Sequence, residues 1–317
     1  MILVSGEALV DLIPDPDLEG RYDAKLGGSP YNVAIGLARL GAPVGFVSKL
    51  STDANGEALA AALTAEGVDL SRAVRDPRPT PLAFVMRGTA QTGSRYSFYL
   101  DATAFDGAWP FPPAWPPAAR HLHVGSIAAL DPRHGARAAD ALAQARGRLT
   151  TSFDPNVRPM VTPDRAAVLA LAEKQASLAS VVKASEEDLE WLYPGRPVEE
   201  TLASWAAMGP LFCIVTRGAE GAIAWAGDQR LVVPPRKAEV ADTVGAGDSF
   251  MSALLSAMDR DGALGPAAAR PTLDRLAAWT DFASRASAIT CTRRGSQPPT
   301  RAEVEASFSK VAAATKA

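Results

Sequence analysis

Residues 238–258 read AEVADTVGAGDSFMSALLSAM and place a turn of small residues between a β-like run and an alanine- and leucine-rich helix. The run ends at Asp242, the turn Gly245-Ala246-Gly247 follows, and the helix is expected to start at Asp248. Small residues let a ligand approach the backbone, and the free N–H groups and dipole of a helix N-terminus attract anions. The segment therefore predicts an anion-binding turn. Asp248 has two interpretations, because it could cap the helix or accept a proton beside the anion.

A second glycine-rich turn lies near the N-terminus, within LGGSPYNVAIGLARLG at residues 26–41. Pro30 suits the first position of a helix, so a helix is expected to begin there. Gly27 and Gly28 would let a polar ligand reach the backbone, and the amide of Asn32 carries both a donor and an acceptor for hydroxyl groups. The alternative is a plain junction between a loop and a helix.

Short β-rich runs alternate with longer helical runs along the rest of the chain. Strands that alternate with helices argue for a parallel sheet covered on both faces, the doubly wound α/β class. The expected strands are residues 2–6, 44–50, 121–125, 150–154, 180–184 and 211–216, and the expected helices include residues 133–146, 164–176 and 185–193.

Two segments interrupt this alternation. Residues 8–27 mix short apolar runs with prolines and a glycine, and residues 81–100 have the pattern of two strands joined by a glycine-containing turn. We expect them to form a small antiparallel sheet beside the main one. The alternative is an ordinary edge hairpin of the main sheet.

The composition excludes several classes of protein. The 317 residues are 47% hydrophobic and 21% charged, which allows a sizeable core and excludes a disordered chain. A formal net charge of −3 leaves no basic excess for binding nucleic acid. Cys213 and Cys291 lie in apolar stretches, as expected for buried thiols in a reducing compartment. The first residues do not resemble a signal peptide and no run could span a bilayer, so a soluble cytoplasmic protein without a membrane partner is expected.

Several other sites are excluded by their missing motifs. The chain has no G-x-x-x-x-G-K-[ST] loop, no H-E-x-x-H and no paired C-x-x-C. Gly245 and Gly247 lack the third glycine of a dinucleotide-binding loop and come late in the chain. His121 and His123 alternate on one strand and could mimic a metal pair, but we interpret them as structural residues of the strand.

The motifs GGSPYN and DTVGAGDSF together resemble the two signatures of the ribokinase-like (PfkB) carbohydrate kinases, in the order and separation that this family shows. The resemblance implies a ribokinase-like fold: a doubly wound, mostly parallel central sheet with helices on both faces and a small β-sheet lid. It also implies one kinase domain over residues 1–317, with the lid formed by about residues 8–27 and 81–103. Further segments resemble fructokinase-type members: GEALVDLIP (6–14), VGSIA (124–128), FDPNVRP (153–159), KASEEDLEWL (183–192), TRGAEGA (216–222) and AITCTRRGSQPPTRAEV (288–304).

The resemblance implies a role for each matching position. Asp248 matches the catalytic base, and Gly245, Ala246 and Gly247 match the anion hole for the transferred phosphate. The positions that match the sugar side are Asp11, Gly27, Gly28 and Asn32, with Arg158 near the phosphates and Arg95 and Tyr96 as lid contacts. The positions that match the nucleotide side are Ser185, Thr216, Arg217, Gly218, Gly245 and Gly247.

The expected metal sites follow from the same resemblance, with one departure. Where the family commonly has Asn-x-x-Glu to organise Mg²⁺, this chain reads Ser185-Glu186-Glu187-Asp188. Either Asp188 acts on Mg²⁺ through water, or Glu187 takes its place. Many members also bind a monovalent cation such as K⁺ next to the anion hole, and the matching positions here are Asp242, Val244 and carbonyl groups near Arg293 and Gly295.

The implied activity is ATP-dependent phosphorylation of a primary hydroxyl of a small sugar, with fructose to fructose 6-phosphate as first choice. Alternatives within the class are 2-keto-3-deoxygluconate kinase and ribokinase; a nucleoside kinase or a catalytically silent sugar-binding protein are more distant ones. Tyr99-Leu100-Asp101 lacks the basic residue that many fructokinase-type chains place after this lid strand. An edge of the lid would also be a natural contact for a homodimer.

Overall fold

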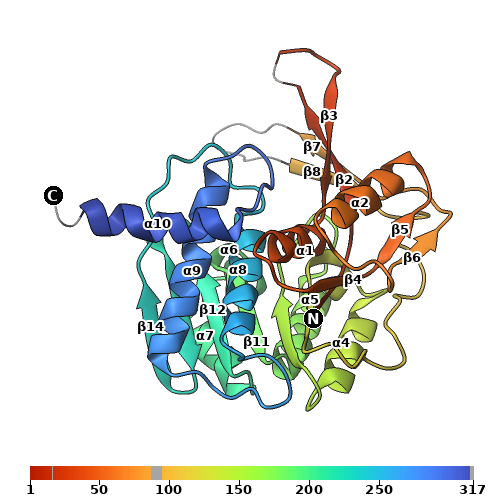
Figure 1. The fold of residues 1–317 in the computed structure, drawn as a ribbon. Coiled ribbons are helices and arrows are strands. Elements are labelled where there is room, and N and C mark those ends of the chain that lie inside the picture. The colour runs from red at the N-terminus through yellow and green to blue at the C-terminus, as the bar shows by residue number, and fades with distance from the viewer. Residues whose placement is uncertain (16, 87–94, 315–317) are drawn as a thin grey trace.

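The fold is known from a computed structural model, which describes residues 1–15, 17–86 and 95–314 and centres on an eight-stranded sheet (Figure 1). Six strands are parallel, from β4 to β12, and β13 and β14 continue the sheet as antiparallel strands. The strands in spatial order are β14 (Gln229–Val233), β13 (Ala222–Ala226), β12 (Phe212–Thr216), β11 (Val181–Ser185), β10 (Thr150–Asp154), β9 (His121–Gly125), β1 (Ile2–Ser5) and β4 (Val44–Val47).

Helices cover both faces of this sheet, as the doubly wound class requires. Because successive side chains of a strand point to opposite faces, neighbours such as Val181 and Val182 join different cores. The helices on one face are α1 (Ser29–Arg39), α2 (Ala54–Ala65), α8 (Ala246–Arg260) and α9 (Leu273–Cys291). Those on the other face are α3 (Ser126–Leu130), α4 (Gly135–Ala145), α5 (Arg165–Leu178), α6 (Glu186–Leu192) and α7 (Val198–Ala207), while α10 (Arg301–Ala314) contacts α9.

A separate four-stranded sheet, called the small sheet below, stands above the main one in Figure 1. It consists of β3 (Tyr22–Gly27), β2 (Leu9–Pro14), β7 (Leu82–Met86) and β8 (Arg95–Tyr99), in that order. The prediction of a wholly antiparallel sheet is wrong at its centre, because β2 and β7 pair in parallel. Each hairpin, β2–β3 and β7–β8, is formed by strands that are neighbours in the sequence. The relative direction of β2 and β7 is decided only when the two hairpins pack side by side.

Smaller differences come from tertiary contacts. The strand expected over residues 44–50 is divided, since β5 (Lys49–Ser51) leaves the main sheet and pairs with β6 (Val74–Asp76). A short 3₁₀ helix, η1 (Gly218–Glu220), follows β12. In the part of the chain that the structure describes, no helix is long and apolar enough to cross a membrane.

The carboxyl ends of the parallel strands form the edge on which a ligand site is expected. β1 lies between β4 and β9, so later segments of the chain add strands on both sides of β1. In open α/β sheets this kind of switch point leaves a crevice outside the carboxyl ends of the strands. The small sheet begins directly after β1, which places it beside that crevice.

Candidate active site

Asp248 lies inside the first turn of α8 and does not cap the helix. The helix begins at Ala246, and its N-cap residue is Gly245, with no side-chain cap. The Asp248 carboxylate instead accepts hydrogen bonds from Ser29 Oγ at 2.7 Å and from Asn32 Nδ2 at 2.8 Å. The capping interpretation is therefore wrong, and the acid is held by the glycine-rich turn at the start of α1.

The surroundings of Asp248 bias it toward accepting a proton. Burial raises the pKa of this carboxyl, while the hydrogen bonds from Ser29 and Asn32 and the charges of Lys183 and Arg158 act to lower it. A carboxylate whose affinity for a proton is increased by burial, with cations nearby that favour its charged form, suits a general base.

Two glycines at the start of α8 lie close to neighbouring side chains. Gly245 has φ of 76°, a left-handed conformation, and a Cβ there would overlap Ser296 Oγ. A Cβ at Gly247 would lie 2.9 Å from Lys183 Nζ. Gly245 is thus required by its conformation and by close packing, and Ala246 and Gly247 line the adjoining pocket. A helix N-terminus that opens into a pocket in this way can bind an anion.

The sugar-side residues meet at a second tight turn. A Cβ at Gly27 would overlap Asp11 Oδ2, and a Cβ at Gly28, where φ is 106°, would lie 2.6 Å from the carbonyl oxygen of Glu7. Burial raises the pKa of Asp11 to about 6; the charge of Arg158 opposes this shift and that of Asp248 adds to it. Asp11 from β2, Arg158 from the segment after β10 and Asp248 from α8 therefore lie near one another.

Arg158 and Tyr96 both lie close to Asp11, since the charge of Arg158 acts on Asp11 and the charge of Asp11 acts on Tyr96. The Arg158 guanidinium donates to Asn156 Oδ1 at 2.7 Å, which holds its charge near Asp11 and Asp248. Tyr96 comes from β8, and burial together with the charge of Asp11 raises the pKa of its phenol. The predicted Arg95 belongs to the same strand, but its side chain lies outside the described residues.

A pocket of about 810 Å³ adjoins the anion-binding turn. It is formed by the end of β11, the start of α6, η1, the segment before α8, and α9. Arg217 does not belong to its lining; its guanidinium pairs with Glu186 at 3.2 Å and with Glu220. The predicted residues that do line it are Ser185, Glu187, Asp188, Thr216, Gly218, Ala246 and Gly247.

Asp188 and Glu187, the two acids predicted to bind a metal near α6, differ in exposure to solvent. Asp188 is buried, and its oxygens accept from the N–H of Val157 at 2.7 Å and from the N–H and Oγ of Ser185 at 2.8 Å. The bond from Val157 to Oδ1 ties α6 to the segment after β10, and the capping box with Ser185 uses Oδ2, so both oxygens accept hydrogen bonds. Glu187 is exposed and lines the pocket. Within residues 1–15, 17–86 and 95–314, no group of three acidic, histidine or cysteine side chains could hold a metal by itself.

The three positions predicted for a monovalent cation do come together. Asp242 accepts hydrogen bonds from the N–H of Val244 at 3.1 Å and from the N–H of Gly295 at 2.8 Å. Ser296 Oγ, which packs against Gly245, is buried without a partner among the described residues. An unused buried oxygen beside this loop fits a cation bound there.

The sequence motifs did not single out Asp154, Lys183 and Ser29. Asp154, the last residue of β10, and Lys183, in the middle of β11, form an ion pair of 2.9 Å, with side chains only 2% and 4% exposed. The available signal was a lysine within the buried strand Val181–Ser185, because lysine is rarely buried unless it is paired. His121 and His123 instead bond Thr150 and Ser152 across strands at 2.8 Å, which supports their interpretation as structural residues.

The chain matches a family model described as pfkB family carbohydrate kinase over residues 1–303. It is 34% identical to a fructokinase of Rhizobium leguminosarum bv. trifolii over 83% of this chain and 81% of that protein. It is 33% identical to fructokinase-1 of Oryza sativa subsp. japonica over 96% of each. A 2-dehydro-3-deoxygluconokinase of Bacillus subtilis is 30% identical over 74% of each.

Solved structures show the same architecture. A Xylella fastidiosa fructokinase with bound ATP superposes with a TM-score of 0.86 at 27% identity over 98% of each chain. A Vibrio cholerae fructokinase with bound fructose, ADP and calcium ion gives 0.82 at 28% identity, over 96% of this chain and 97% of that one. A double mutant of the latter protein holds a potassium ion and gives the same score. The predicted ribokinase-like fold is thereby confirmed.

Proposed function

The chain belongs to the pfkB family of carbohydrate kinases, and from this membership we propose that it phosphorylates fructose with ATP to give fructose 6-phosphate. Its enzyme class, a phosphotransferase with an alcohol group as acceptor, follows from the family itself. The fructose assignment is supported by the fructokinases among its relatives and by the fructose-bound structure that it resembles.

The observation that carries the proposal is the placement of Asp248 between a sugar-side turn and an anion-binding turn. Asp11 would hold sugar hydroxyls by charge-assisted hydrogen bonds. The attacking hydroxyl gives its proton to Asp248 as its oxygen bonds to the γ-phosphorus, and the bond to the bridging oxygen of ADP breaks. The N–H groups at the start of α8, with Arg158 nearby, would stabilise the charge on the transferred group.

The small sheet is proposed to act as a lid on a single kinase domain of residues 1–317. Its strands lie within residues 8–27 and 81–103, and the phenol of Tyr96 responds to the charge of Asp11. A sheet closed over the sugar would exclude water and so limit hydrolysis of ATP.

Mg²⁺ is proposed as the divalent metal, held mainly by the nucleotide phosphates. The donor set fits this mode, because Mg²⁺ commonly takes one or two carboxylates together with substrate phosphates and water. Glu187 is the exposed carboxylate that would assist it, whereas Asp188 would only position the start of α6. When bound, Mg²⁺ neutralises phosphate charge. K⁺ is proposed to bind where the N–H of Gly295 donates a hydrogen bond to the Asp242 carboxylate.

A homodimer through the lid is also proposed. Tyr22, Phe84 and Tyr99 form edge-to-face aromatic contacts, with ring centroids 5.6 and 5.4 Å apart. Tyr22 and Tyr99 are 46% and 59% exposed, so this aromatic group is open to a partner. A cytoplasmic location suits an enzyme that uses ATP and carries the free thiols of Cys213 and Cys291.

A second candidate substrate is 2-keto-3-deoxygluconate. Lys25 pairs in register with Asp11 across β2 and β3, so its side chain is on the same face of the small sheet. An ammonium there, together with Arg158, could meet the carboxylate of an acid sugar, and a relative from Bacillus subtilis carries the corresponding name.

The test is a coupled assay of ADP formation over fructose, ribose, 2-keto-3-deoxygluconate, glucose, fructose 6-phosphate and adenosine. We expect the highest kcat/KM with fructose. A value ten-fold higher for another acceptor, equivalent to ~1.4 kcal/mol, would replace fructose as the substrate and leave the kinase class in place. Asp248→Asn, purified in parallel, shows whether the measured activity comes from this site.

A further inference from the structure

The buried pair of Asp154 and Lys183 lies directly beneath the anion-binding turn. The register of β10 and β11 places Ser152 opposite Val181, and two residues further along each strand come Asp154 and Lys183. Their side chains meet at 2.9 Å and are almost wholly excluded from solvent. Lys183 Nζ lies 2.9 Å from the point that a Cβ of Gly247 would occupy, and Lys183 lines the pocket together with Gly247. The ammonium thus fills the space below the first turn of α8.

This pair is incomplete as a structural ion pair. Asp154 Oδ1 has no hydrogen-bond partner among the described residues, and the bond to Asp154 Oδ2 is the one hydrogen bond recorded for the ammonium there. Burying charged groups with unused donors and acceptors costs stability, and an apolar pair of similar volume is often as stable or more so. Stability alone therefore does not account for a lysine at this position.

The charges around Lys183 indicate what it does. The carboxylates of Asp154, Asp188 and Asp248 all interact with this ammonium, and together they outweigh the effect of burial, so that the pKa of Lys183 is raised. The other charged groups that act on Asp248 are Arg158, after β10, and the neighbouring acids Asp11 and Asp154. Lys183 is thus the cation that acts on Asp248 from beneath the anion-binding turn.

We propose that Lys183, oriented by Asp154, is a positioning residue for phosphoryl transfer: its ammonium supports the turn at Gly247 and supplies the positive charge that balances the Asp248 carboxylate. The inference rests on the proposed function, because it assigns Lys183 to the same reaction. It acts through Asp248 and the turn, whereas Asp11 and Asn32 would contact the sugar.

The test compares Lys183→Met with wild type, using whichever acceptor of the panel gives the highest kcat/KM. We expect kcat to fall by at least about ten-fold, with the KM values for ATP and sugar changed by less than about three-fold. In a plot of kcat against pH, kcat falls on the acid side, and we call this part of the curve the acid limb. The acid limb should shift to higher pH by about one unit, because a cation that favours the Asp248 carboxylate has been removed. If fructose is not the best acceptor, the substrate proposal fails and this comparison still stands.

A second variant separates positioning from folding. Lys183→Met combined with Asp154→Leu replaces the charged pair by an apolar one, which is expected to fold without a lone buried charge. This double variant should melt near or above the wild-type temperature and remain as slow as Lys183→Met. Recovery of kcat to within about three-fold of wild type, with an unshifted acid limb, would overturn the proposal and leave the pair as structural.

Lys49→Met is the matched control. Lys49 is also buried, but its ammonium bonds the carbonyl oxygens of Asp106 and Gly107, away from the anion-binding turn. Loss of this lysine should lower the melting temperature and leave the acid limb of the kcat profile in place. A shift of that limb as large as in Lys183→Met would show that the effect is not specific to Lys183.

Discussion

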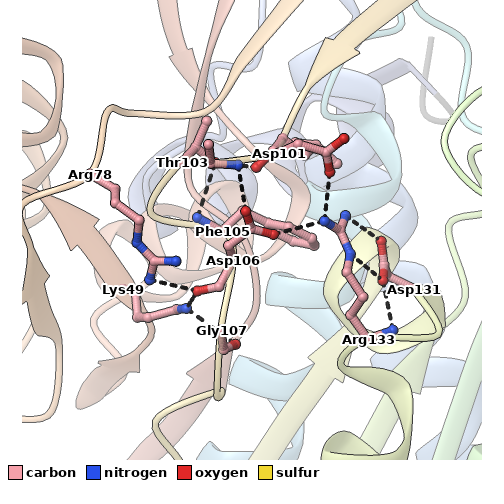
Figure 2. A network of polar contacts seen from close by, with 11 residues as sticks. Lys49, Arg78, Asp101, Thr103, Phe105, Asp106, Gly107, Asp131 and Arg133 are labelled. Atoms are coloured by element: carbon pink, nitrogen blue, oxygen red, sulfur yellow. Dashed lines mark hydrogen bonds and ion pairs between the residues drawn. The ribbon is translucent and has the colours of Figure 1, made fainter.

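Two networks of charged side chains in this protein differ in how their charges are balanced. The site cluster consists of Asp11, Asp154, Lys183 and Asp248, at the carboxyl edge of the main sheet. The second network, called the brace, joins β5 and the segment after β6 to the loop that follows β8 and to the α3–α4 turn. Its residues are Lys49, Arg78, Asp101, Asp106, Asp131 and Arg133 (Figure 2).

The brace pairs its charges closely. Figure 2 shows Arg133 between three carboxylates, at 2.7 Å from Asp101 and 2.8 Å from Asp106 and Asp131. Lys49 and Arg78 both donate to the carbonyl oxygen of Asp106. Burial alone would raise the pKa of Asp131, but the hydrogen bonds and charge of Arg133 hold it below its usual value. Arg133 thus stabilises Asp131 in the charged form that this side chain has in water.

The site cluster leaves its acids in excess. Burial raises the pKa of Asp11 and of Asp154 to about 6, and it raises that of Asp248 as well. Burial of acids beside few cations is unfavourable for folding, and perturbed pKa values of this kind are common at functional sites. The comparison therefore separates charges that hold the fold from charges to which the proposed function assigns a part in the reaction.

The largest expected effect is that of Asp248→Asn. Asparagine keeps the size of the side chain but cannot take the proton of the attacking hydroxyl, so kcat should fall by at least about a hundred-fold. Removal of a buried carboxylate should not lower the melting temperature. Steady-state kinetics and thermal unfolding of the same preparation check both statements, and a variant with more than about a tenth of wild-type turnover would remove Asp248 from its role as base.

Asp11→Ala should act on sugar binding. Charge-assisted hydrogen bonds to two hydroxyls contribute roughly 1.5–3 kcal/mol each, so the KM for the sugar should rise by more than about ten-fold. The KM for ATP should change little, because the nucleotide pocket is lined by other elements. Initial rates over a matrix of both substrates measure the two constants. Equal rises in both would mean that β2 supports the site only as a strand.

The two networks should also respond differently to pH. Because the pKa of Asp11 is raised to about 6, against 3.8 for a free side chain, ionisation of this carboxyl at higher pH costs the folded protein stability. As pH falls through about 6, protonation relieves this cost, and kcat/KM for the sugar should decrease while the fold gains stability. Asp131, whose pKa is lowered, contributes stability that is lost only as pH falls below the usual range of an aspartate.

Activity and melting temperature between pH 5 and 8 check this prediction. The expected pattern is a loss of kcat/KM below about pH 6 in a protein that remains folded. Parallel loss of activity and melting temperature would show that the acids of the site cluster act in folding, like those of the brace.

The smallest expected effect on catalysis is that of Arg133→Met in the brace. It leaves the buried carboxylate of Asp131 without its partner, and the free energy of unfolding should decrease by about 1–2 kcal/mol. Turnover and both KM values should stay within about two-fold of wild type. Denaturant unfolding and the standard assay measure these quantities. A large loss of kcat in a stable Arg133→Met variant would mean that the brace also controls the small sheet.

Much of the fold could be predicted from local patterns. The strands at residues 121–125 and 150–154 have the predicted bounds, and α5 lies within two residues of the expected helix at each end. The parallel pairing of β2 with β7 could not be predicted, because each hairpin satisfies only its own hydrogen bonds. The division between β4 and β5 likewise depends on the meeting of β5 with β6.

The sequence by itself determined the two glycine-rich turns, their helices and the family to which the chain belongs. These features rest on backbone conformation and short-range spacing, which neighbouring residues specify. Tertiary structure alone decided that Asp248 bonds Ser29 and Asn32, 219 and 216 residues away, and that Lys183 meets Asp154. Burial and Coulomb interaction depend on distance in space, so the charge state of the site exists only once the chain has folded.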